Sequence, residues 1–354
     1  MSAFEDHSGK IGSKLFHEIL RPQSGRQRDE VIKGPRFGVD TAVIDIGDGK
    51  GLATSSDPLS LIPALGLKES AWLSVHLLAN DMATTGFSPQ YAQFTLNLPT
   101  NFSLDKFKRY WGHIHRFCDE IGVAITGGHT GQIPGQESTT PGGGTMFLQA
   151  PLDDIISSDG GEPGDKIVVT KESALVASSI LAKSFPETVK AECGEEIYQQ
   201  GCRNFYRTSS LDDALAASEV LAPNQELRAM HDVTEGGLLG GISELAEASS
   251  CGFCVDSDKL PVGRAPQKIC ELFEIDHRLC VGAGSMIMAV TEGQEQALVN
   301  HLQDQDIPAT VVGELMDSSG GQILVEDGED QEFQFDGSDP YWNAFFEAME
   351  AGWK

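Results

Sequence analysis

The sequence predicts a two-domain α/β protein. At 354 residues the chain is longer than one ordinary hydrophobic core needs. Short β-like runs alternate with helix-like segments through the first half, and a new series of apolar strands begins at residue 166. Between the halves, residues 153–165 combine acidic residues with turn-forming glycines, which favours a boundary there. We expect a β-rich N-terminal domain over 1–155, a C-terminal α/β domain over 163–335, and a tail over 336–354.

In the first half, four short runs combine apolar residues with flanking turn formers and predict strands: 37–46, 51–56, 91–98 and 146–150. Between them, apolar residues recur at helical spacing over 70–85. A second helix is expected after Ser103, a plausible N-cap. The apolar run 122–126 predicts a further strand, which leads into a glycine-rich turn at 127–131.

The second half begins with an apolar strand at 166–170, which several helices follow. The segment 230–249 carries a glycine pair at the start of an expected helix. Later strands are expected around 285–290, 310–313 and 322–325. The tail has enough aromatic residues for a short amphipathic helix at most.

Composition excludes several classes of partner. The formal net charge is −28, from 53 acidic and 25 basic residues. Such a surface repels phosphate backbones and anionic lipid, so we expect neither nucleic acid nor membrane as a partner. No apolar stretch approaches the ~20 residues of a membrane span, and the polar start lacks a signal-peptide core. A cytoplasmic protein is therefore expected. A polyanionic ligand would have to be brought in with metal ions and local backbone donors. The acidity also fits a salt-rich cytoplasm.

Cysteine usage favours reduced thiols, because the chain has seven scattered cysteines and no disulfide-like framework. Cys251-x-x-Cys254, with Cys270 and Cys280 further on, raises zinc binding as an alternative. A four-cysteine site usually repeats the close pair, whereas nine residues separate the second pair here. Ordinary buried thiols are the favoured interpretation.

Aspartates occur in four separate segments that share small or polar neighbours: Asp40, Asp57, Asp81 and Asp232. Magnesium prefers hard oxygen ligands and bridges them to substrate phosphates, so carboxylates from separate segments are the expected arrangement. Taken singly, each could equally be an N-cap or turn residue. Two glycine-bearing segments, 127–131 and 234–237, would let backbone N–H groups approach an anion. Each of these segments also fits a plain tight turn.

Together these segments resemble the AIR synthase superfamily over residues 9–320. The resemblance rests on five ordered elements: 38–42, 55–57, 80–86, 127–130 and 231–238. They are similar to the family's Gly-Asp-Asp-Ala-Ala, Ser/Thr-Thr-Asp, Asn-Asp-x-x-x-x-Gly, Gly-Gly-Asp/Glu/His-Thr and Asp-x-Thr-x-Gly-Gly-Leu elements. Val39 replaces the first aspartate of the first element, which implies one fewer metal ligand.

The resemblance implies an ATP- and Mg²⁺-dependent enzyme that phosphorylates an oxygen on a small substrate. It implies a homodimer whose N-terminal domains share a β-barrel, with Asp40, Asp57, Asp81 and Asp232 as magnesium ligands. Lys10, Asp57 and His129 are the implied catalytic residues, with Lys10 neutralising phosphate charge and His129 contacting phosphate or carrying a proton. Nucleotide contacts are implied at Gly9, Lys10, Gly12, Asn80, Gly127, Gly128, His129, Thr130, Thr234, Gly236 and Gly237.

Within the superfamily, the element at 231–238 and the N-terminal Gly-Lys segment look most like the hydrogenase-maturation branch. That branch carries a C-terminal cysteine, whereas this sequence ends Glu-Ala-Gly-Trp-Lys. A thiamine-monophosphate kinase-like activity and a non-catalytic, ATP-binding regulatory role therefore stay open as alternatives. The phosphate acceptor and any maturation partner protein also stay open.

Overall fold

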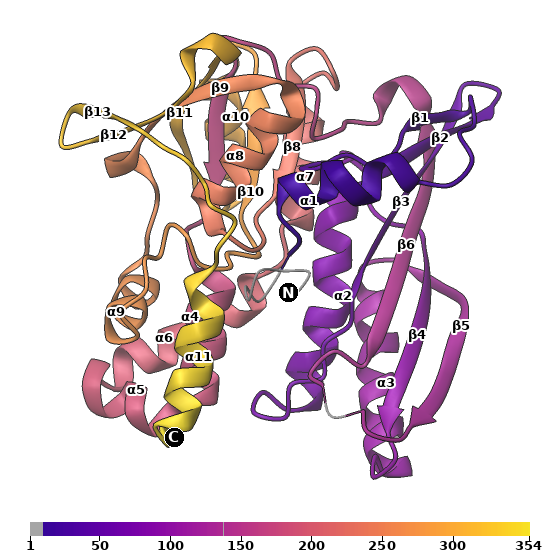
Figure 1. Ribbon diagram of the computed structural model, residues 1–354, viewed down its shortest axis with the longest axis vertical. Helices are drawn as coiled ribbons and strands as arrows, with labels where there is room; N and C mark the ends of the chain where they lie inside the picture. Colours follow the sequence, from indigo (N-terminus) through magenta and orange to yellow (C-terminus); the bar gives the residue numbers. More distant parts are fainter. Residues whose placement is uncertain (1–9, 137) are drawn as a thin grey trace.

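Two separate sheets organise the chain, and each carries its own helices (Figure 1). The structure is a computed structural model that describes residues 10–136 and 138–354. In the N-terminal sheet the strands lie in the order β1 (Val31–Lys33), β2 (Ala42–Gly47), β3 (Lys50–Pro58), β6 (Gly142–Pro151), β4 (Tyr91–Pro99) and β5 (Ala124–Ile133). All neighbours are antiparallel except β4 and β5, which are parallel.

One face of this sheet is covered by α2 (Leu67–Ala83) and α3 (Leu104–Glu120). Along β4, buried and exposed residues alternate, so Phe94 and Leu96 face the helices while Thr95 faces the other side. Ser103 caps α3, because its hydroxyl accepts a hydrogen bond from the Lys106 backbone N–H at 3.3 Å. The predicted N-cap is confirmed.

The C-terminal sheet has the order β13 (Glu329–Glu332), β12 (Gln322–Glu326), β9 (Cys251–Asp256), β11 (Ala309–Asp317), β7 (Lys166–Thr170), β10 (Met286–Val290) and β8 (Leu227–Asp232). Helix α8 (Gly237–Ser249) packs on one face with Ile167 and Ile287. Helices α7 (Leu211–Val220) and α10 (Glu295–Asp304) pack on the other face with Val168 and Met288. Both faces are covered, which explains the unbroken apolar runs of β7 and β10.

A group of helices lies beside the C-terminal sheet: α4 (Leu175–Ser184), α5 (Pro186–Cys193), α6 (Glu195–Asn204), α9 (Arg264–Leu272) and α11 (Pro340–Glu350). Helix α11 belongs to the expected tail and is an integral part of this group, because Tyr341 and Ala348 are buried in its core. Its N-cap is Asp339, whose side chain accepts a hydrogen bond from the Tyr341 backbone N–H.

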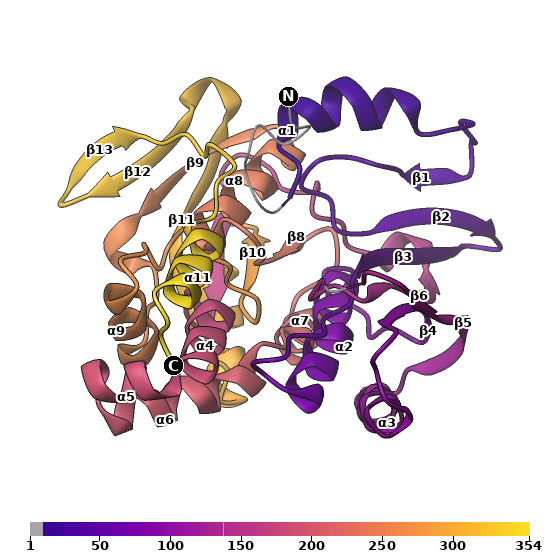
Figure 2. The same cartoon turned by 60° about the horizontal axis from the view of Figure 1, so that its bottom comes forward.

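The N-terminal segment forms α1 (Ser13–Leu15), which continues through a π turn at Phe16–Leu20 and a 3-10 turn at Arg21–Gln23. This segment lies against α8 of the other domain (Figure 2), where Ser13 Oγ donates to Glu247 at 2.5 Å. Other 3-10 turns are Leu152–Asp154, Phe205–Arg207, Ser257–Lys259 and Ser318–Gly320.

The turn expected at 127–131 is wrong, because these residues lie inside β5. Gly128 has φ 141°, and a Cβ there would lie 1.9 Å from the Phe94 carbonyl oxygen on β4. The glycine is therefore needed for close strand pairing and not for a turn. Strands β1, β8, β9 and β13 also did not follow from the periodicity. None of the helices in the described residues is long and apolar enough to cross a membrane.

Candidate functional site

The four aspartates of the sequence analysis converge where the two domains meet. Asp81 lies on α2 and Asp57 near the end of β3, while Asp40 precedes β2 and Asp232 ends β8. Ser55 Oγ donates to Asp81 at 2.5 Å, which joins α2 to β3. The carboxylates are close enough to repel one another, Asp81 from Asp232 and Asp40, and Asp57 from Asp81. The structure thus brings together residues that lie 192 positions apart in the chain, from 40 to 232.

This cluster has more negative charge than its protein neighbours offset. Burial and the neighbouring carboxylates raise the pKa of Asp57, Asp81 and Asp232 well above the usual range. Asp232 Oδ2 is buried and has no hydrogen-bond partner among the residues that the structure describes. An unpartnered oxygen in a cluster of buried acids is what a hard cation would relieve, so the donor set fits Mg²⁺.

The carboxylates do not by themselves form a ready cage. Within the described ranges, no group of three or more acidic, histidine or cysteine side chains is placed to hold a metal ion. Magnesium is commonly bound by one or two carboxylates together with substrate phosphates and water. This geometry therefore suits an ion that arrives with a phosphorylated ligand.

A chain of alternating charges runs from the aspartate cluster to the N-terminal segment. Asp40 Oδ2 accepts hydrogen bonds from Ser158 Oγ at 2.9 Å and from His231 Nδ1 at 2.8 Å. His231 Nε2 lies 3.3 Å from Glu244 Oε2, and the same oxygen accepts a 2.7 Å bond from Lys10 Nζ. These contacts fix one oxygen of Asp40 against the second domain.

The charge states of this chain follow from its neighbours. Burial alone would lower the pKa of His231, but Asp40 and Glu244 outweigh it and raise the pKa to about 10. Burial opposes ionisation of Glu244, yet Lys10 and His231 lower its pKa to about 2. Sequence reasoning missed Glu244. The available signal was an acidic residue within the apolar run 238–246 of α8, because a charged residue at a buried position is rare unless it is paired.

Lys10 is the one member of the predicted N-terminal site segment with a described side-chain contact. Besides Glu244, its ammonium lies 5.6 Å from the centre of the Phe37 ring. Gly12 is the N-cap residue of α1 and is exposed. Gly9 lies outside the described residues. The segment is thus tied to the second domain through Lys10, next to the aspartate cluster.

The second glycine segment forms the start of α8, as expected. Gly236 has φ 82° and Gly237 has φ 62°. A Cβ on Gly236 would lie 2.3 Å from the Phe335 ring, so both the backbone conformation and the space require glycine. The Gly236 N–H donates to Asp339 Oδ2 at 2.9 Å. A carboxylate of the chain itself therefore occupies one N–H group that was predicted to face a nucleotide. Thr234 contributes its carbonyl oxygen, which accepts from the Gly237 and Gly282 N–H groups.

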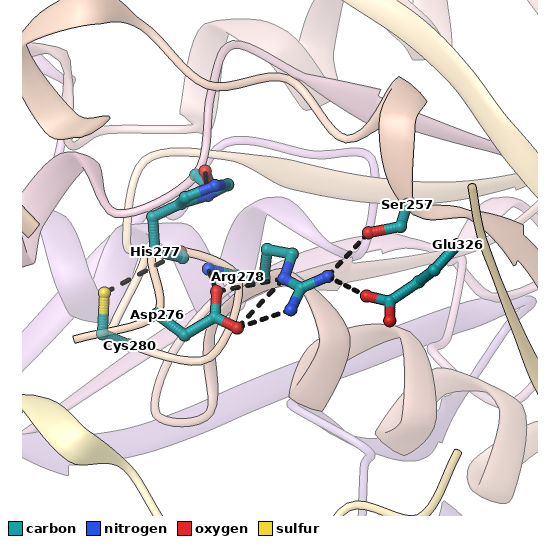
Figure 3. A network of polar contacts seen from close by, with 7 residues as sticks. Ser257, Asp276, His277, Arg278, Cys280 and Glu326 are labelled. Atoms are coloured by element: carbon teal, nitrogen blue, oxygen red, sulfur yellow. Dashed lines mark hydrogen bonds and ion pairs between the residues drawn. The ribbon is translucent and has the colours of Figure 1, made fainter. Parts of the chain in front are cut away.

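The loop 276–282 packs against this turn and stabilises it through backbone hydrogen bonds. The Arg278 carbonyl oxygen accepts a hydrogen bond from the Leu239 N–H at 3.1 Å. Figure 3 shows the Arg278 guanidinium between Asp276 and Glu326, with a further bond to Ser257 Oγ at 2.7 Å. Arg278 thus fixes the loop against β12 and the turn at 257–259, and through its carbonyl holds the first turn of α8.

Asn80 is placed beside the aspartate cluster, but its amide holds the domains together. The side chain donates to the Thr208 carbonyl oxygen at 3.0 Å and accepts from the Ser210 N–H at 2.8 Å. Trp72 Nε1 reaches Thr208 Oγ1 of the same turn at 3.0 Å. Both contacts position α2, and with it Asp81, against the C-terminal domain.

The remaining predicted site residues lie apart from the cluster. Gly127, Gly128, His129 and Thr130 are exposed on the edge strand β5. Gly128 pairs with Phe94 on β4, Phe94 pairs with Gly144 on β6, and Gly144 pairs with Asp57 on β3. Gly128 and Asp57 are therefore three strand spacings apart. At about 4.8 Å per strand this separation is about 14 Å. Within one chain, His129 therefore does not join the aspartates.

Known proteins share both domains of this chain. Residues 38–147 match the family described as AIR synthase related protein, N-terminal domain, and residues 162–326 match its C-terminal domain. The chain belongs to the AIR synthase-related family. This confirms the resemblance inferred from the five sequence elements, and the two mixed sheets are the family's two-domain α/β fold.

Among its curated relatives, the AIR synthase-related chain is similar to a putative hydrogenase expression/formation protein of Methanocaldococcus jannaschii. The identity is 24% over 332 residues, covering 88% of this chain and 91% of the relative. It is also similar to the carbamoyl dehydratase HypE of Cupriavidus necator, with 26% identity over 252 residues, covering 69% of this chain and 67% of HypE.

Two solved structures with similar folds contain nucleotides. The hydrogenase maturation protein HypE in complex with ATP has a TM-score of 0.68 at 18% identity, covering 94% of this chain and 97% of HypE. The AaThiL structure complexed with AMPPCP and TMP also has a TM-score of 0.68, at 17% identity, covering 92% of this chain and 96% of AaThiL. At these identities the likeness concerns the fold.

Proposed function

We infer that this AIR synthase-related protein is an ATP- and Mg²⁺-dependent enzyme that phosphorylates an oxygen on a small substrate, of the hydrogenase-maturation type. The observation that carries this proposal is the uncompensated cluster of Asp57, Asp81 and Asp232. Strongly perturbed carboxylates that meet between two domains are typical of functional sites. The ATP and AMPPCP complexes of fold relatives support a nucleotide as the ligand.

Each residue has a defined task in this proposal. The free oxygen of Asp232, together with Asp40, Asp57 and Asp81, would hold magnesium, which supplies positive charge to the triphosphate when bound. His231 keeps Asp40 oriented, because it holds Asp40 Oδ2 at 2.8 Å. Lys10 stands at the edge of the cluster, where its ammonium would offset charge on the transferred phosphoryl group.

The proposal includes a homodimer. The face of the N-terminal sheet opposite α2 and α3 carries exposed apolar residues, among them Tyr91 and Ile46. Two such faces packed together would bury them in a shared barrel. His129 and its neighbours on β5 would then contact ATP bound by the partner, which accounts for their distance from Asp57 in one chain.

A maturation partner protein fits the same proposal, since a chain in the structure of a HypE–HypF complex has a fold similar to that of this chain.

A non-catalytic, ATP-binding regulatory role is the second candidate. The specific observation in its favour is the bond from the Gly236 N–H to Asp339, because this donor is not free for phosphate. A thiamine-monophosphate kinase-like activity is a variant of the first candidate and differs only in the acceptor.

Nucleotide turnover of the purified protein tests these alternatives. ADP release from ATP and Mg²⁺ is measured for wild type and Asp57→Asn with thiamine monophosphate, formylglycinamidine ribonucleotide, and carbamoyl-bearing thiols as acceptors. Turnover that requires Asp57 and rises with one acceptor supports the enzyme and identifies its branch. Tight ATP binding without turnover supports the regulatory role. A folded protein that does not bind ATP contradicts both.

A further inference from the structure

A cavity of about 560 Å³ lies next to the aspartate cluster and is not explained by it. Helix α8 contributes Ser243, Glu244 and Glu247 to its lining. The N-terminal segment 10–15 and residues 334–337, which lead into α11, also line it. Lys10 and Glu235 line the cavity and also interact with Asp40 or Asp57 of the cluster. The two spaces are therefore adjacent, and a ligand in one would lie beside a ligand in the other.

Two aromatic side chains give the cavity flat apolar surfaces. Phe335 is held by close packing, since a Cβ on Gly236 or Gly240 would lie 2.3 Å or 3.2 Å from its ring. Phe37 packs edge-on against Phe16 with ring centres 6.1 Å apart. Both rings are partly buried and line the cavity. Such walls favour a planar ligand, and the volume suits one small molecule.

Most charged side chains around the cavity already have hydrogen-bond or ion-pair partners within the protein. Glu244 is paired with Lys10 at 2.7 Å. Glu247 accepts from Ser13 Oγ and contacts His17 Nε2 at 3.3 Å. Glu235 differs, because its half-buried side chain has no hydrogen bond or ion pair within the described part of the chain. A carboxylate without a hydrogen bond or salt bridge, in a cavity that two aromatic rings also line, favours a ligand with a cationic or N–H-bearing edge over an anionic one.

We propose that this cavity binds the acceptor substrate and that Glu235 selects a planar acceptor with a cationic or N–H-donating edge. This inference rests on the proposed function, since the neighbouring cluster is taken as the site of ATP. Glu235 lies close enough to Asp57 to repel its carboxylate, so an acceptor bound to Glu235 lies beside the proposed magnesium site. Lys14, on α1, also lines the cavity, but its side chain is exposed to solvent whereas Glu235 is half-buried.

Three planar probes of the same shape test the charge selection: benzamidine (cationic), benzamide (neutral, with N–H donors) and benzoate (anionic). Their binding to the full chain is measured by titration calorimetry at neutral pH without nucleotide. We expect benzamidine to bind at least tenfold more tightly than benzoate, with benzamide between them. Glu235→Gln should weaken the binding of benzamidine about tenfold and leave the binding of benzamide unchanged. Equal affinities, or a benzamidine affinity that does not respond to Glu235→Gln, would overturn the proposal.

Glu247→Gln is the matched control, because it makes the same change on the same cavity at a carboxylate that already has partners. It should leave the order of the three probes unchanged. If it weakens benzamidine as much as Glu235→Gln does, the general acidity of the region and not Glu235 decides binding, and the assignment fails. Phe335→Leu keeps an apolar side chain but removes the flat ring, and it should weaken the binding of all three probes by a similar factor.

Competition with ATP separates this inference from the proposed function. If ATP with Mg²⁺ binds in an Asp57-dependent manner and benzamidine binds at the same time, both proposals are supported. If ATP displaces benzamidine, the cavity receives the nucleoside and the acceptor assignment is wrong, while the proposed function stands. If ATP does not bind but the probes still discriminate by charge, the proposed function fails, and with it the acceptor role of the cavity.

Discussion

The backbone N–H of Gly236 donates a hydrogen bond to the carboxylate of Asp339 at 2.9 Å, although 103 residues separate them. The same carboxylate caps α11 through Tyr341. One acidic side chain therefore connects the C-terminal helix to the start of α8, where the glycine turn of the candidate site lies. Through this contact, the segment 336–354, which was predicted to be a tail, packs against the candidate site.

The stability contribution of Asp339 should depend on pH. Burial raises its pKa to about 6, although the Gly236 and Tyr341 N–H groups lower it. Because the folded-state pKa lies above the ordinary value of about 3.9, this contribution is present in acid and is lost as pH rises through 6. Between pH 4 and pH 7, the free energy of unfolding of Asp339→Asn should rise relative to that of wild type by up to about 3 kcal/mol, at about 1.4 kcal/mol per pKa unit.

Urea unfolding of both proteins at several pH values measures this difference, with Asp304→Asn as an exposed control. A difference between Asp339→Asn and wild type that is the same at pH 4 and pH 7 would contradict the raised pKa.

Removing the Glu244 carboxylate should destabilise the fold. Glu244→Gln leaves the buried His231 cation and Lys10 without their shared partner, and breaking a buried pair of this kind costs about 3 kcal/mol or more. The free energy of unfolding in urea measures the loss. Glu247→Gln, on the same helix and more exposed, should change it by no more than about 0.5 kcal/mol. Similar losses in both variants would show that the Lys10–Glu244–His231 chain is not a special stabilising feature.

Asp57→Asn should increase the thermal stability of the protein and abolish its activity. The pKa of Asp57 is raised by burial and by Asp81, so the ionised carboxylate is unfavourable in the protein without ligands. Replacing it with a neutral amide should raise the Tm without Mg²⁺ by about 2 °C or more and abolish Mg²⁺-dependent ATP turnover. Asp48→Asn, in the exposed turn between β2 and β3, serves as the control and should change neither. A lower Tm for Asp57→Asn would show that the carboxylate is structural.

Arg278 should act on nucleotide binding without contacting the nucleotide. Its guanidinium holds the loop whose carbonyl oxygen supports Leu239 in the first turn of α8 (Figure 3). Arg278→Ala should raise the KM for ATP about tenfold, or about 1.4 kcal/mol, with little change in kcat. Arg278→Lys should recover part of that loss. Arg116→Ala, which removes an exposed pair with Glu120, is the control. An unchanged KM for Arg278→Ala would contradict this positioning role.

The proposed homodimer can be tested on the open face of the N-terminal sheet. Thr95→Arg places a charge at an exposed position of β4 next to His129, and we expect it to convert a dimer into a monomer. Light scattering after gel filtration should give twice the 38.0 kDa chain mass for wild type and 38.0 kDa for the variant. Gln296→Arg on the exposed side of α10 should remain dimeric. A wild-type monomer would remove the basis for a contribution of His129 across subunits.

Local patterns determined much of this protein. The apolar stripe and Ser103 placed α3 and its first turn, because capping and periodicity act over a few residues. The family followed from five short elements in a fixed order. The aspartates could be named as candidates because carboxylates among small residues are conspicuous in a sequence.

Only the tertiary structure decided what these residues contact. Glu244 became the partner of Lys10 and His231 because the N-terminal segment, β8 and α8 meet. Lys10 and Glu244 are 234 residues apart in the chain. Asn80 holds Thr208 and Ser210 across the domain boundary, and Gly128 allows strand pairing although its surroundings in sequence predict a turn. Periodicity and capping report the state of a short segment. The pairing of buried charges and the close approach of two backbones depend on segments that meet only after folding, so no local pattern encodes them.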